Sequence, residues 1–526
     1  MNRLTTFSRF LLTLLIVGGL FFAGKYLLQN TETGKNLTHK ADQLPKADGP
    51  VGNTPVGSSS SPADNDPNTI KIGVVTWGGY AGGQYFNEGF AASEASRFTK
   101  EYGIKVAFKV LDDFDASRAA WKKDEVNLLW ATADAFPTEA GALKDFDPQV
   151  VFQADWSRGG DAIVVRRGIN TVADLKGKKI ALAELTPSHS FLIWLLDAGG
   201  LSGTDVTVVK QSNAIDAAQA FKSGQVDAAV VWSPDDEACI SAVPGARILQ
   251  STRSASNIIA DVFIAKRRYI EANKEKLQKL YEGWMRGAAE INGSEEAKQK
   301  AAKILTAKFD GTTQEMNVKS INNVRLCTHG DNLNFFGLTP EYKGVNGEAL
   351  YNRMSAVYKS LGYIKDNAPS WRLVADPELI RATSQLTGSA NAAEGQKTFA
   401  APTEALKTKE AIATKRISIS FRSGEYALDE NAKYIVDKDF VQIAKAFSNS
   451  RIRVEGNTDN TGSPTTNKAL SLKRAQSVVD YMVSAYGMAR NRFIVVGAGQ
   501  DNPVAGNDTE EGKSKNRRTD FEIVSE

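Results

Sequence analysis

The chain has 526 residues, of which 42% are apolar, so it is too long for one hydrophobic core and two or three globular domains are expected. Its 64 basic and 61 acidic residues nearly cancel to a net charge of +3, and no dense basic block stands out, which argues against a nucleic-acid partner. Two cysteines, Cys239 and Cys327, and three histidines are too few for a disulfide framework or a multi-histidine metal centre. We therefore expect no metal and no cofactor, while the sequence leaves open whether the two cysteines pair.

The N-terminus has the pattern of an export segment. Arg3 and Arg9 precede the apolar run Phe10–Ala23, which resumes briefly at Tyr26–Leu28. A cleaved signal peptide and an uncleaved anchor both fit this pattern. As a helix, residues 10–28 would cover about 28 Å, close to the hydrocarbon thickness of a bilayer, and no clear cleavage site follows. We therefore predict a transmembrane anchor in residues 1–28, in the bacterial inner membrane, with the rest of the chain in the periplasm.

Two stretches have the composition of linkers. Residues 29–68 are polar, and Gly49–Asn68 is rich in Gly, Ser, Pro and Asn without hydrophobic periodicity, which is typical of a flexible tether. A weaker shift toward Ala, Gly, Thr and Lys predicts a second linker at residues 386–414. The boundaries imply two globular regions, at residues 69–385 and 415–526.

Short apolar strands alternate with helical stretches in the first globular region. The predicted strands are Thr69–Thr76, Lys179–Ala183, Val206–Lys210 and Ala228–Trp232, and the predicted helices are Ser188–Ala198 and Ala214–Ser223. Alternation of this kind predicts an α/β fold with a parallel sheet. Together with the length and the export segment, it suggests a two-lobed binding protein.

Several segments of this region resemble the substrate-binding proteins of nitrate, sulfonate and taurine ABC importers. They are Ala154–Gly168 (ADWSRGGDAIVVRRG), Val172–Lys178 (VADLKGK), Ser188–Leu196, Leu201–Val209 and Ala217–Pro234 (AAQAFKSGQVDAAVVWSP). The resemblance implies a type II periplasmic binding fold, in which two α/β lobes close on a small-molecule ligand, and an ABC permease as a partner. A relative of this fold acts as a thiamine-precursor synthase through a cysteine-rich iron motif. No such cluster occurs here, so we expect no enzymatic activity and no catalytic residue.

The carboxyl ends of the predicted strands indicate where a ligand would lie. Candidate ligand-binding residues at these ends are Thr76, Trp77, Thr186, Ser188, His189 and Trp232. Thr186 precedes a proline at the first helical position, and such a helix start presents free N–H groups to an anion. The alternative is that Thr186 and Ser188 only cap their own helix.

The residues after Trp232 complicate the choice of ligand. Asp235, Asp236 and Glu237 follow Trp232 directly and would repel a sulfonate, unless they face solvent or serve the next helix N-terminus. The ligand is therefore left open as a small polar molecule, with zwitterions included.

The second globular region predicts an α+β sandwich with helices over one face of the sheet. Its predicted strands are Arg416–Phe421, Arg451–Glu455, Phe493–Val496 and Phe521–Val524, and its predicted helices are Asp429–Phe447 and Thr466–Tyr486. The order is β-α-β-α-β-β. On the long helix, Ala475, Val478, Val479 and Met482 share one side and are expected to face the core.

Residues 455–481 (EGNTDNTGSPTTNKALSLKRAQSVVDY), followed by Gly497-Ala498-Gly499 and Asn516-Arg517-Arg518, resemble the OmpA-like family. The resemblance implies that the domain binds the diaminopimelate residue of peptidoglycan stem peptides. Asp459 would then bind the ligand ammonium and Arg474 its carboxylate, with Thr458, Asn467 and Arg517 completing the pocket. A free amino-acid end is a zwitterion and needs one anion and one cation, and arginine offers a planar fork for a carboxylate. The alternative is an ordinary surface ion pair between Asp459 and Arg474, worth under about 1 kcal/mol.

These features together predict a non-enzymatic receptor, anchored in the membrane and bound to the wall, which presents ligand to a permease or reports its occupancy. A different class, the flagellar stator B subunits, shares the plan of an anchor plus an OmpA-like domain. Phe10–Leu28 contains no acidic residue, so ion conduction is disfavoured, but a structural or motor-associated scaffold remains possible. A third alternative is that the lobes have lost their ligand and act as a spacer.

Overall fold

The computed structural model describes residues 66–419, 421 and 424–524. The predicted anchor, residues 1–28, and all but the last three residues of the predicted linker at 29–68 lie outside the described residues. Across the part that is described, the helices are too short or too polar to span a bilayer.

The first lobe is built on a six-stranded sheet of order β11-β4-β10-β3-β1-β2. Its strands are β1 (Ile70–Val74), β2 (Val106–Val110), β3 (Leu128–Thr132), β4 (Pro148–Ser157), β10 (Ala260–Lys266) and β11 (Val324–Leu326). Strand β1 runs parallel to β2 and β3, whereas β10 is antiparallel to β3 and β4, and β4 is antiparallel to β11. Every residue of β3, β4 and β10 is buried, as expected for strands covered on both faces.

The second lobe is built on a five-stranded sheet of order β7-β6-β8-β5-β9. Its strands are β5 (Asp161–Val165), β6 (Lys179–Ala183), β7 (Thr207–Gln211), β8 (Ala228–Trp232) and β9 (Arg247–Ser251). The prediction of a parallel sheet is correct for β7-β6-β8 and wrong for β5, which is antiparallel to both of its neighbours. Strands β5 and β10 enter from the other lobe, and short apolar runs do not reveal that direction.

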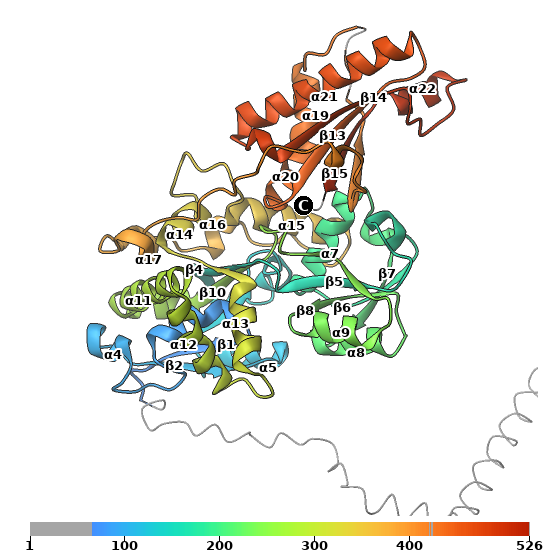
Figure 1. The fold of residues 1–526 in the computed structure, drawn as a ribbon. Coiled ribbons are helices and arrows are strands. Elements are labelled where there is room, and N and C mark those ends of the chain that lie inside the picture. Colours follow the sequence, from blue (N-terminus) through green and yellow to red (C-terminus); the bar gives the residue numbers. More distant parts are fainter. Residues whose placement is uncertain (1–65, 420, 422–423, 525–526) are drawn as a thin grey trace, which may run out of the picture. The chain divides into compact units, whose positions relative to one another are not determined.

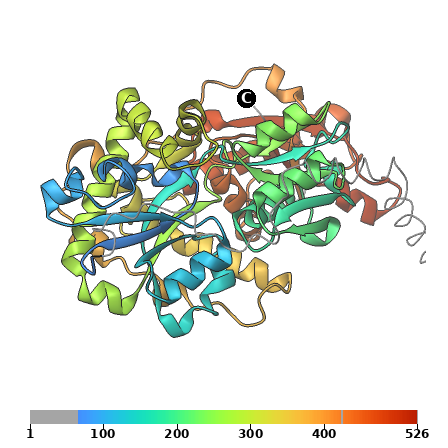
Figure 2. The same cartoon turned by 90° about the horizontal axis from the view of Figure 1, so that it is seen from below.

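Helices cover both sheets, and Figures 1 and 2 show the two sheets side by side. Around the first sheet lie α3 (Ala81–Phe86), α4 (Arg97–Tyr102), α5 (Phe114–Lys122), α6 (Pro137–Ala140), α10 (Arg267–Ala272), α11 (Lys274–Gly293), α12 (Glu295–Thr306), α13 (Gln314–Asn322), α14 (His329–Phe335), α15 (Gly347–Ser360), α16 (Trp371–Val374) and α17 (Glu378–Ala382). The second sheet carries α7 (Pro187–Ala198), α8 (Ala214–Lys222) and α9 (Asp235–Ala242). Helix α8 starts where the Asn213 side chain accepts a hydrogen bond from the Asp216 amide, an N-cap that the sequence pattern favours.

The chain crosses between the two sheets twice. Residues 158–160 join β4 to β5, and residues 252–259 join β9 to β10. Thr252 ties the two crossing segments together: its Oγ1 lies 2.8 Å from Ser157 Oγ and accepts a hydrogen bond from the Gly159 amide at 2.8 Å. Both cysteines, Cys239 and Cys327, are buried and free.

The C-terminal domain has a four-stranded sheet of order β12-β15-β13-β14, in which only β13 and β14 pair in parallel. Its elements are β12 (Ala413–Ile417), α19 (Glu430–Val436), a π-helical turn at Asp437–Val441, α20 (Gln442–Ala446), β13 (Arg451–Asn457), α21 (Pro464–Tyr486), β14 (Phe493–Gly499), α22 (Glu510–Asn516) and β15 (Thr519–Val524). The predicted order omits α22, whose sequence, EEGKSKN, has no apolar periodicity. The four residues predicted to face the core from α21 are all fully buried.

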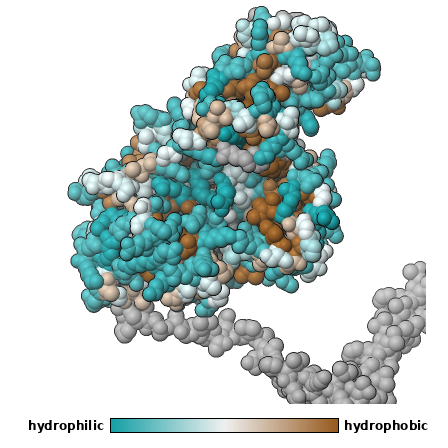
Figure 3. Space-filling view, viewed as in Figure 1, coloured by the Kyte–Doolittle hydropathy of each residue, from teal (hydrophilic) through white to brown (hydrophobic). Residues whose placement is uncertain are grey.

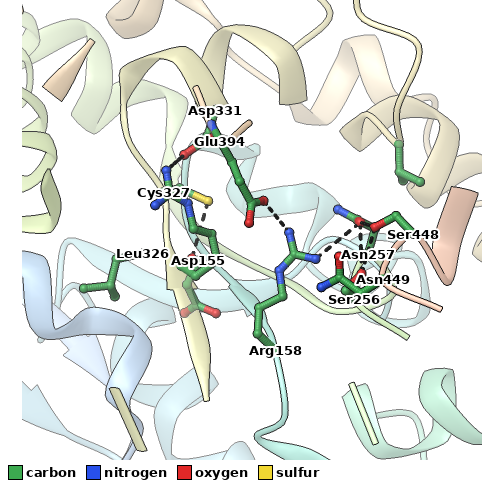
Figure 4. Close-up of polar contacts among 12 residues, drawn as sticks. Asp155, Arg158, Ser256, Asn257, Leu326, Cys327, Asp331, Glu394, Ser448 and Asn449 are labelled. Atoms are coloured by element: carbon green, nitrogen blue, oxygen red, sulfur yellow. Dashed lines mark hydrogen bonds and ion pairs between the residues drawn. The ribbon is translucent and has the colours of Figure 1, made fainter. Parts of the chain in front are cut away.

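The C-terminal domain contacts the second crossing segment. The Asn257 amide donates to the Ala446 carbonyl at 2.9 Å, and Ser448 Oγ donates to Asn257 Oδ1 at 2.6 Å. Figure 4 shows Arg158, in the first crossing segment, between Asn257 and Glu394, with an ion pair to Glu394 of 2.6 Å. Residues of the predicted second linker are held as well, since the Glu394 amide donates to Asp331 Oδ1 at 2.6 Å. Both crossing segments therefore make contacts outside the two lobes.

Large apolar side chains are exposed only singly among the described residues. They are Ile215, Leu373, Tyr426, Tyr434, Leu472 and Val504. The face drawn in Figure 3 is mostly hydrophilic, with small separate apolar areas on the second lobe and on the C-terminal domain. Scattered exposure of this kind is normal for a protein surface.

Helix α21 packs directly on β13 at Gly456, which yields the first prediction. A Cβ atom at Gly456 would lie 2.2 Å from the Ser471 carbonyl oxygen. We expect Gly456→Ala to lower the free energy of unfolding of the C-terminal domain by about 1–3 kcal/mol, because helix and strand must move apart. Chemical denaturation measures the change. Gly395→Ala is the control, since a Cβ atom there meets nothing within 4 Å, and equal stability of the two variants would contradict the prediction.

Candidate functional site

A small cavity lies between the two lobes. It is lined by Val75, Trp77, Tyr80, Trp130, Asp161, Pro187, Trp232, Ile259 and Asp261, and its volume is about 20 Å³. These residues come from the ends of strands and from helix starts in both lobes, the place where open α/β sheets hold their ligands. A space of this size holds about one water molecule, so the lobes are closed on one another in this conformation.

Aromatic side chains form most of the cavity wall. The rings of Trp77 and Trp232, from opposite lobes, meet edge to face with centroids 6.5 Å apart. Trp232 Nε1 donates to Ser188 Oγ at 3.0 Å, and Tyr80 Oη donates to Asp261 Oδ1 at 2.5 Å. These hydrogen bonds fix the polar ends of the rings and leave their faces and edges toward the cavity.

Two glycines allow Trp77 and its partner to take these positions. A Cβ atom at Gly160 would lie 2.1 Å from the Trp77 ring, and one at Gly79 would lie 1.6 Å from Asp155 Oδ2. Asp155 Oδ2 accepts a hydrogen bond of 3.2 Å from Trp77 Nε1. The Gly-Gly pairs of WGGY and SRGGD therefore serve close packing around the tryptophan.

Two buried carboxyl groups, Asp161 and Asp261, line the cavity, and two more, Asp134 and Asp155, are buried near them. Burial raises the pKa of Asp134 to about 7, and burial together with neighbouring Asp134 and Asp236 raises that of Asp161 to about 7. Burial and the charge of Asp161 raise the pKa of Asp155 to about 8, and burial and Asp155 raise the pKa of Asp261 well above its usual range. The cavity is therefore a site where negative charge is costly unless a cation enters.

Two buried polar atoms at the cavity make no hydrogen bond within the described residues. They are Asp155 Oδ1, whose carboxyl group binds Trp77, and the Trp130 Nε1 that belongs to the cavity wall. Buried polar groups are nearly always paired, and unpaired groups concentrate where function requires them. Their gathering around one cavity supports a binding site there.

The structure brings together some of the residues predicted from the strand ends. Trp77 and Trp232 line the cavity, and Ser188 holds Trp232 from the start of α7. Thr186 Oγ1 instead donates to the Ala183 carbonyl, and Thr76 is exposed and bound to Asp112.

His189 lies away from the cavity wall. It packs against Tyr358 and Tyr363, with ring centroids 5.5 and 4.7 Å away, and burial lowers its pKa to about 4, which keeps it neutral. The prediction did not include Asp161 and Asp261. Each is the only acidic residue of a fully buried strand, DAIVV and ADVFIAK, and that pattern is the signal that could have identified them.

The predicted residues of the C-terminal domain all line one pocket. Thr458, Asp459, Asn467, Arg474 and Arg517 surround a hollow of about 560 Å³. Its position is set by the loop after β13, by α21 and by the residues between α22 and β15.

The ion pair in this pocket is not the surface pair between Asp459 and Arg474 that was the alternative to ligand binding. Asp459 Oδ2 pairs with Arg517 Nη1 at 2.6 Å, and Asp459 Oδ1 accepts from the Thr461 amide at 2.8 Å. Burial alone would raise the pKa of Asp459, but the hydrogen bonds from Arg517 and Thr461 lower it. Arg474 Nε donates to the Glu425 carbonyl at 3.0 Å, and its guanidinium lies over the Phe421 ring, 4.8 Å from the centroid. Arg517, rather than Arg474, is thus the partner in the ion pair of Asp459.

The raised pKa values of the cleft give a prediction on stability. Because Asp155 and Asp161 titrate above the ordinary value of 3.8, the folded chain holds protons that the unfolded chain has released, and the free energy of unfolding falls as pH rises toward about 8. The buried His189 and His329, with lowered pKa values, act oppositely below about pH 6.5.

The test is urea unfolding from about pH 6.5 to 8, where the histidines contribute little. Asp161→Asn should flatten the decline, whereas Asp216→Asn, at an exposed position on α8, should leave it unchanged. A wild-type profile without a slope in this range would contradict the prediction.

Comparison with known proteins finds a family match within each globular region. Residues 420–517 match the family model described as OmpA family, and residues 160–297 match that described as NMT1/THI5 like. The chain is 46% identical over 79 residues to the peptidoglycan-binding protein ArfA of Mycobacterium tuberculosis (strain ATCC 25618 / H37Rv), a match covering 15% of this chain and 24% of that protein. It is 36% identical over 110 residues to an aliphatic sulfonates-binding protein of Escherichia coli (strain K12), covering 21% and 34%.

The solved structure of the periplasmic aliphatic sulphonate binding protein SsuA from Escherichia coli superposes with a TM-score of 0.45 at 21% identity, covering 58% of this chain and 96% of that one. The matches to curated relatives span between 24% and 42% of those proteins' own length. The chain therefore contains an NMT1/THI5-like domain followed by an OmpA domain.

Proposed function

We propose that the protein is a solute-binding protein of the cell envelope that is held on the peptidoglycan by its C-terminal domain. The observation that carries the proposal is the convergence of Thr458, Asp459, Asn467, Arg474 and Arg517 on one pocket. Its volume of about 560 Å³ suits the end of a peptide stem.

The pocket offers both charges that a zwitterionic amino-acid end requires. Asp459 is ionised at neutral pH because its pKa is lowered, and it supplies the anion for the ligand ammonium. Arg474 supplies a planar guanidinium for the carboxylate, at a half-buried position where a charge-assisted hydrogen bond is stronger than in water. Arg517, paired with Asp459, keeps that carboxylate oriented. The ligand class that fits is the diaminopimelate residue of a peptidoglycan stem peptide.

The two-lobed domain is the solute-binding half of the proposal. Its cavity lies where the two lobes meet, so closing and opening of the lobes would bury and release a small molecule. We infer that it binds its ligand without transforming it and delivers it to an ABC permease. In this proposal residues 1–28 anchor the chain in the inner membrane, so that the protein is attached at the membrane and at the wall.

Wall binding is tested by sedimenting the full chain with purified sacculi. Asp459→Ala and Arg474→Ala should each reduce the bound fraction at least about tenfold, because each removes one of the two pocket charges that would meet the ammonium and the carboxylate of the ligand.

Asp480→Ala and Arg490→Ala are the matched controls, since these residues form an exposed ion pair outside the pocket of the same domain, and their loss should change nothing. Retained binding by both pocket variants would overturn the site assignment.

A sensing role is a second candidate, and the contacts at the crossing segments favour it. The C-terminal domain touches residues 253–257 through Ala446, Ser448 and Asn449, and Arg158 is tied to Glu394. Lobe motion must change backbone angles in these segments. The contacts that the C-terminal domain makes with them would therefore depend on whether the cleft is open or closed. In this candidate, wall attachment and lobe closure influence one another.

Hydrogen exchange distinguishes sensing from simple tethering. With a diaminopimelate-containing muropeptide as the probe, sensing predicts a change in amide protection in residues 158–160 and 252–259 of the full chain. The change should vanish in Arg474→Ala, which abolishes the wall site, and shrink in Asn257→Ala, which loses the bond from Ser448. Unchanged amide protection in the presence of bound muropeptide would contradict sensing and would leave tethering as the role of the C-terminal domain.

A further inference from the structure

We propose that the cleft between the lobes binds a small organic cation, an alkylammonium or quaternary ammonium ion, held by the carboxylates of Asp161 and Asp261 and by tryptophan rings. The inference rests on the solute-binding half of the proposed function and adds the class of ligand to it. Asp261 comes from β10 of the first lobe and Asp161 from β5 of the second, so a cation between them would join the lobes by charge.

The groups around the cavity disfavour an anion. Asp161 and Asp261 line it, Asp134 raises the pKa of both, and Asp155 raises the pKa of Asp261. The cavity lining contains no lysine, arginine or histidine. A sulfonate or sulfate would therefore meet carboxyl groups and no cationic side chain that could pair with it, and it would lose its hydration on entering the cavity.

The nearest cations are engaged outside the cavity. Arg118 makes two hydrogen bonds of 2.8 Å to Glu139 and lies over the Trp130 ring at 4.7 Å, and Arg158 pairs with Glu394. Lys319, the positive neighbour of Asp236, pairs with Glu237. The positive charge needed to balance the four buried acids is therefore supplied only in part by the protein.

The rings supply a second, independent kind of recognition. Trp77, Trp130 and Trp232 line the same cavity as the two carboxyl groups, and a cation is attracted to the face of such rings, most strongly where water is excluded. Trp130 Nε1 is buried without a partner among the described residues and is available to a ligand atom that accepts a hydrogen bond. Aromatic walls with carboxylates at the lobe junction suit an alkylated ammonium group better than an unalkylated ammonium ion, which holds its water shell more strongly.

The size of the cavity limits the head group. About 20 Å³ in the closed form admits a compact group, so a larger ligand must hold the lobes further apart. A bare metal ion fits less well, because the described residues contain no cluster of three or more His, Cys, Asp or Glu side chains able to hold one. The chemistry that remains is an ammonium head, methylated or carried on a short chain.

The same groups make binding depend on pH. Asp134, Asp155 and Asp261 belong to the first lobe and Asp161 to the second, and their charged or titratable neighbours are Asp236, Tyr80, Arg118, Arg158 and Lys319. Protons and the cation compete for these carboxylates, so the affinity should rise as pH increases from 6 to 8, and binding should release protons. A cation bound by rings alone would show neither effect.

The test measures thermal stability and calorimetric binding of the full chain at equal ionic strength. Tetramethylammonium, methylammonium and choline chloride are the cationic probes, taurine and sodium sulfate are the anionic or zwitterionic ones, and potassium chloride is the blank. At least one organic cation should raise the unfolding temperature, more at pH 8 than at pH 6, by mass action.

Isosteric variants assign the effect to the cleft. Asp261→Asn and Asp161→Asn should weaken cation binding about tenfold or more, and Trp232→Leu should weaken tetramethylammonium more than methylammonium. Asp216→Asn, exposed on the same lobe as Asp161, is the control and should bind as the wild type does.

The outcomes separate the ligand class from the function. Stabilisation by taurine or sulfate alone, or cation binding that survives both Asp→Asn changes, would overturn the cation assignment and leave solute binding standing. Stabilisation by none of the probes would overturn the assignment together with the solute-binding half, while the sacculus experiment would still report on wall attachment.

Discussion

The double passage of the chain between the two sheets is the constraint on which the rest of the structure depends. Strands β4 and β10 are neighbours in the first sheet and continue across residues 158–160 and 252–259 into β5 and β9 of the second. Two covalent connections, tied together through Thr252, hold the lobes face to face and define the line about which they can move. They also explain the mixed sheets, because a strand arriving from the other lobe runs against the local βαβ units. The cavity, the acids beside it and the contacts of the C-terminal domain all lie along this line.

Electrostatics at this junction is unusual for a buried region. Asp155 and Asp261 are cross-strand neighbours on β4 and β10. Asp161 comes directly after the first crossing segment, residues 158–160. Burying like charges costs free energy and raises their pKa values, and a fold selected for stability alone would replace them. Glycines at positions 79 and 160 allow Trp77 to approach these acids, so close packing and unfavourable charge occur at the same place. That combination is typical of a binding site, where the missing interaction is supplied by the ligand.

The pocket of the C-terminal domain and the cleft between the lobes are built in different ways. The C-terminal pocket is open and is shaped by the loop after β13, by α21 and by the residues between α22 and β15. It already contains an ion pair between Arg517 and Asp459. The cleft is closed and is assembled from six separate segments of the chain. A preformed charged pocket suits permanent attachment to a polymer, whereas a cleft that must open suits exchange of a small molecule. The contacts of Ser448 and Asn449 with the second crossing segment place the two kinds of site in one mechanical unit.

The sequence alone predicted more of the C-terminal pocket than of the cleft, and the reason is physical. In the C-terminal domain Thr458, Asp459, Asn467 and Arg474 lie within 17 positions of one another, on a turn and the first turns of a helix, so their spacing fixes their proximity. Strands β6 and β8 and helices α7 and α8 were likewise readable from apolar periodicity. For the cleft, the sequence predicted correctly only Trp77, Ser188 and Trp232. A sequence pattern locates the ends of strands but does not show which of these ends face each other. That Asp161 and Asp261 share a cavity, that β5 and β10 run antiparallel, and that His189 packs away from the cleft were decided by tertiary structure alone. Residues a hundred positions apart meet only when the sheets are complete, and no local pattern encodes that pairing.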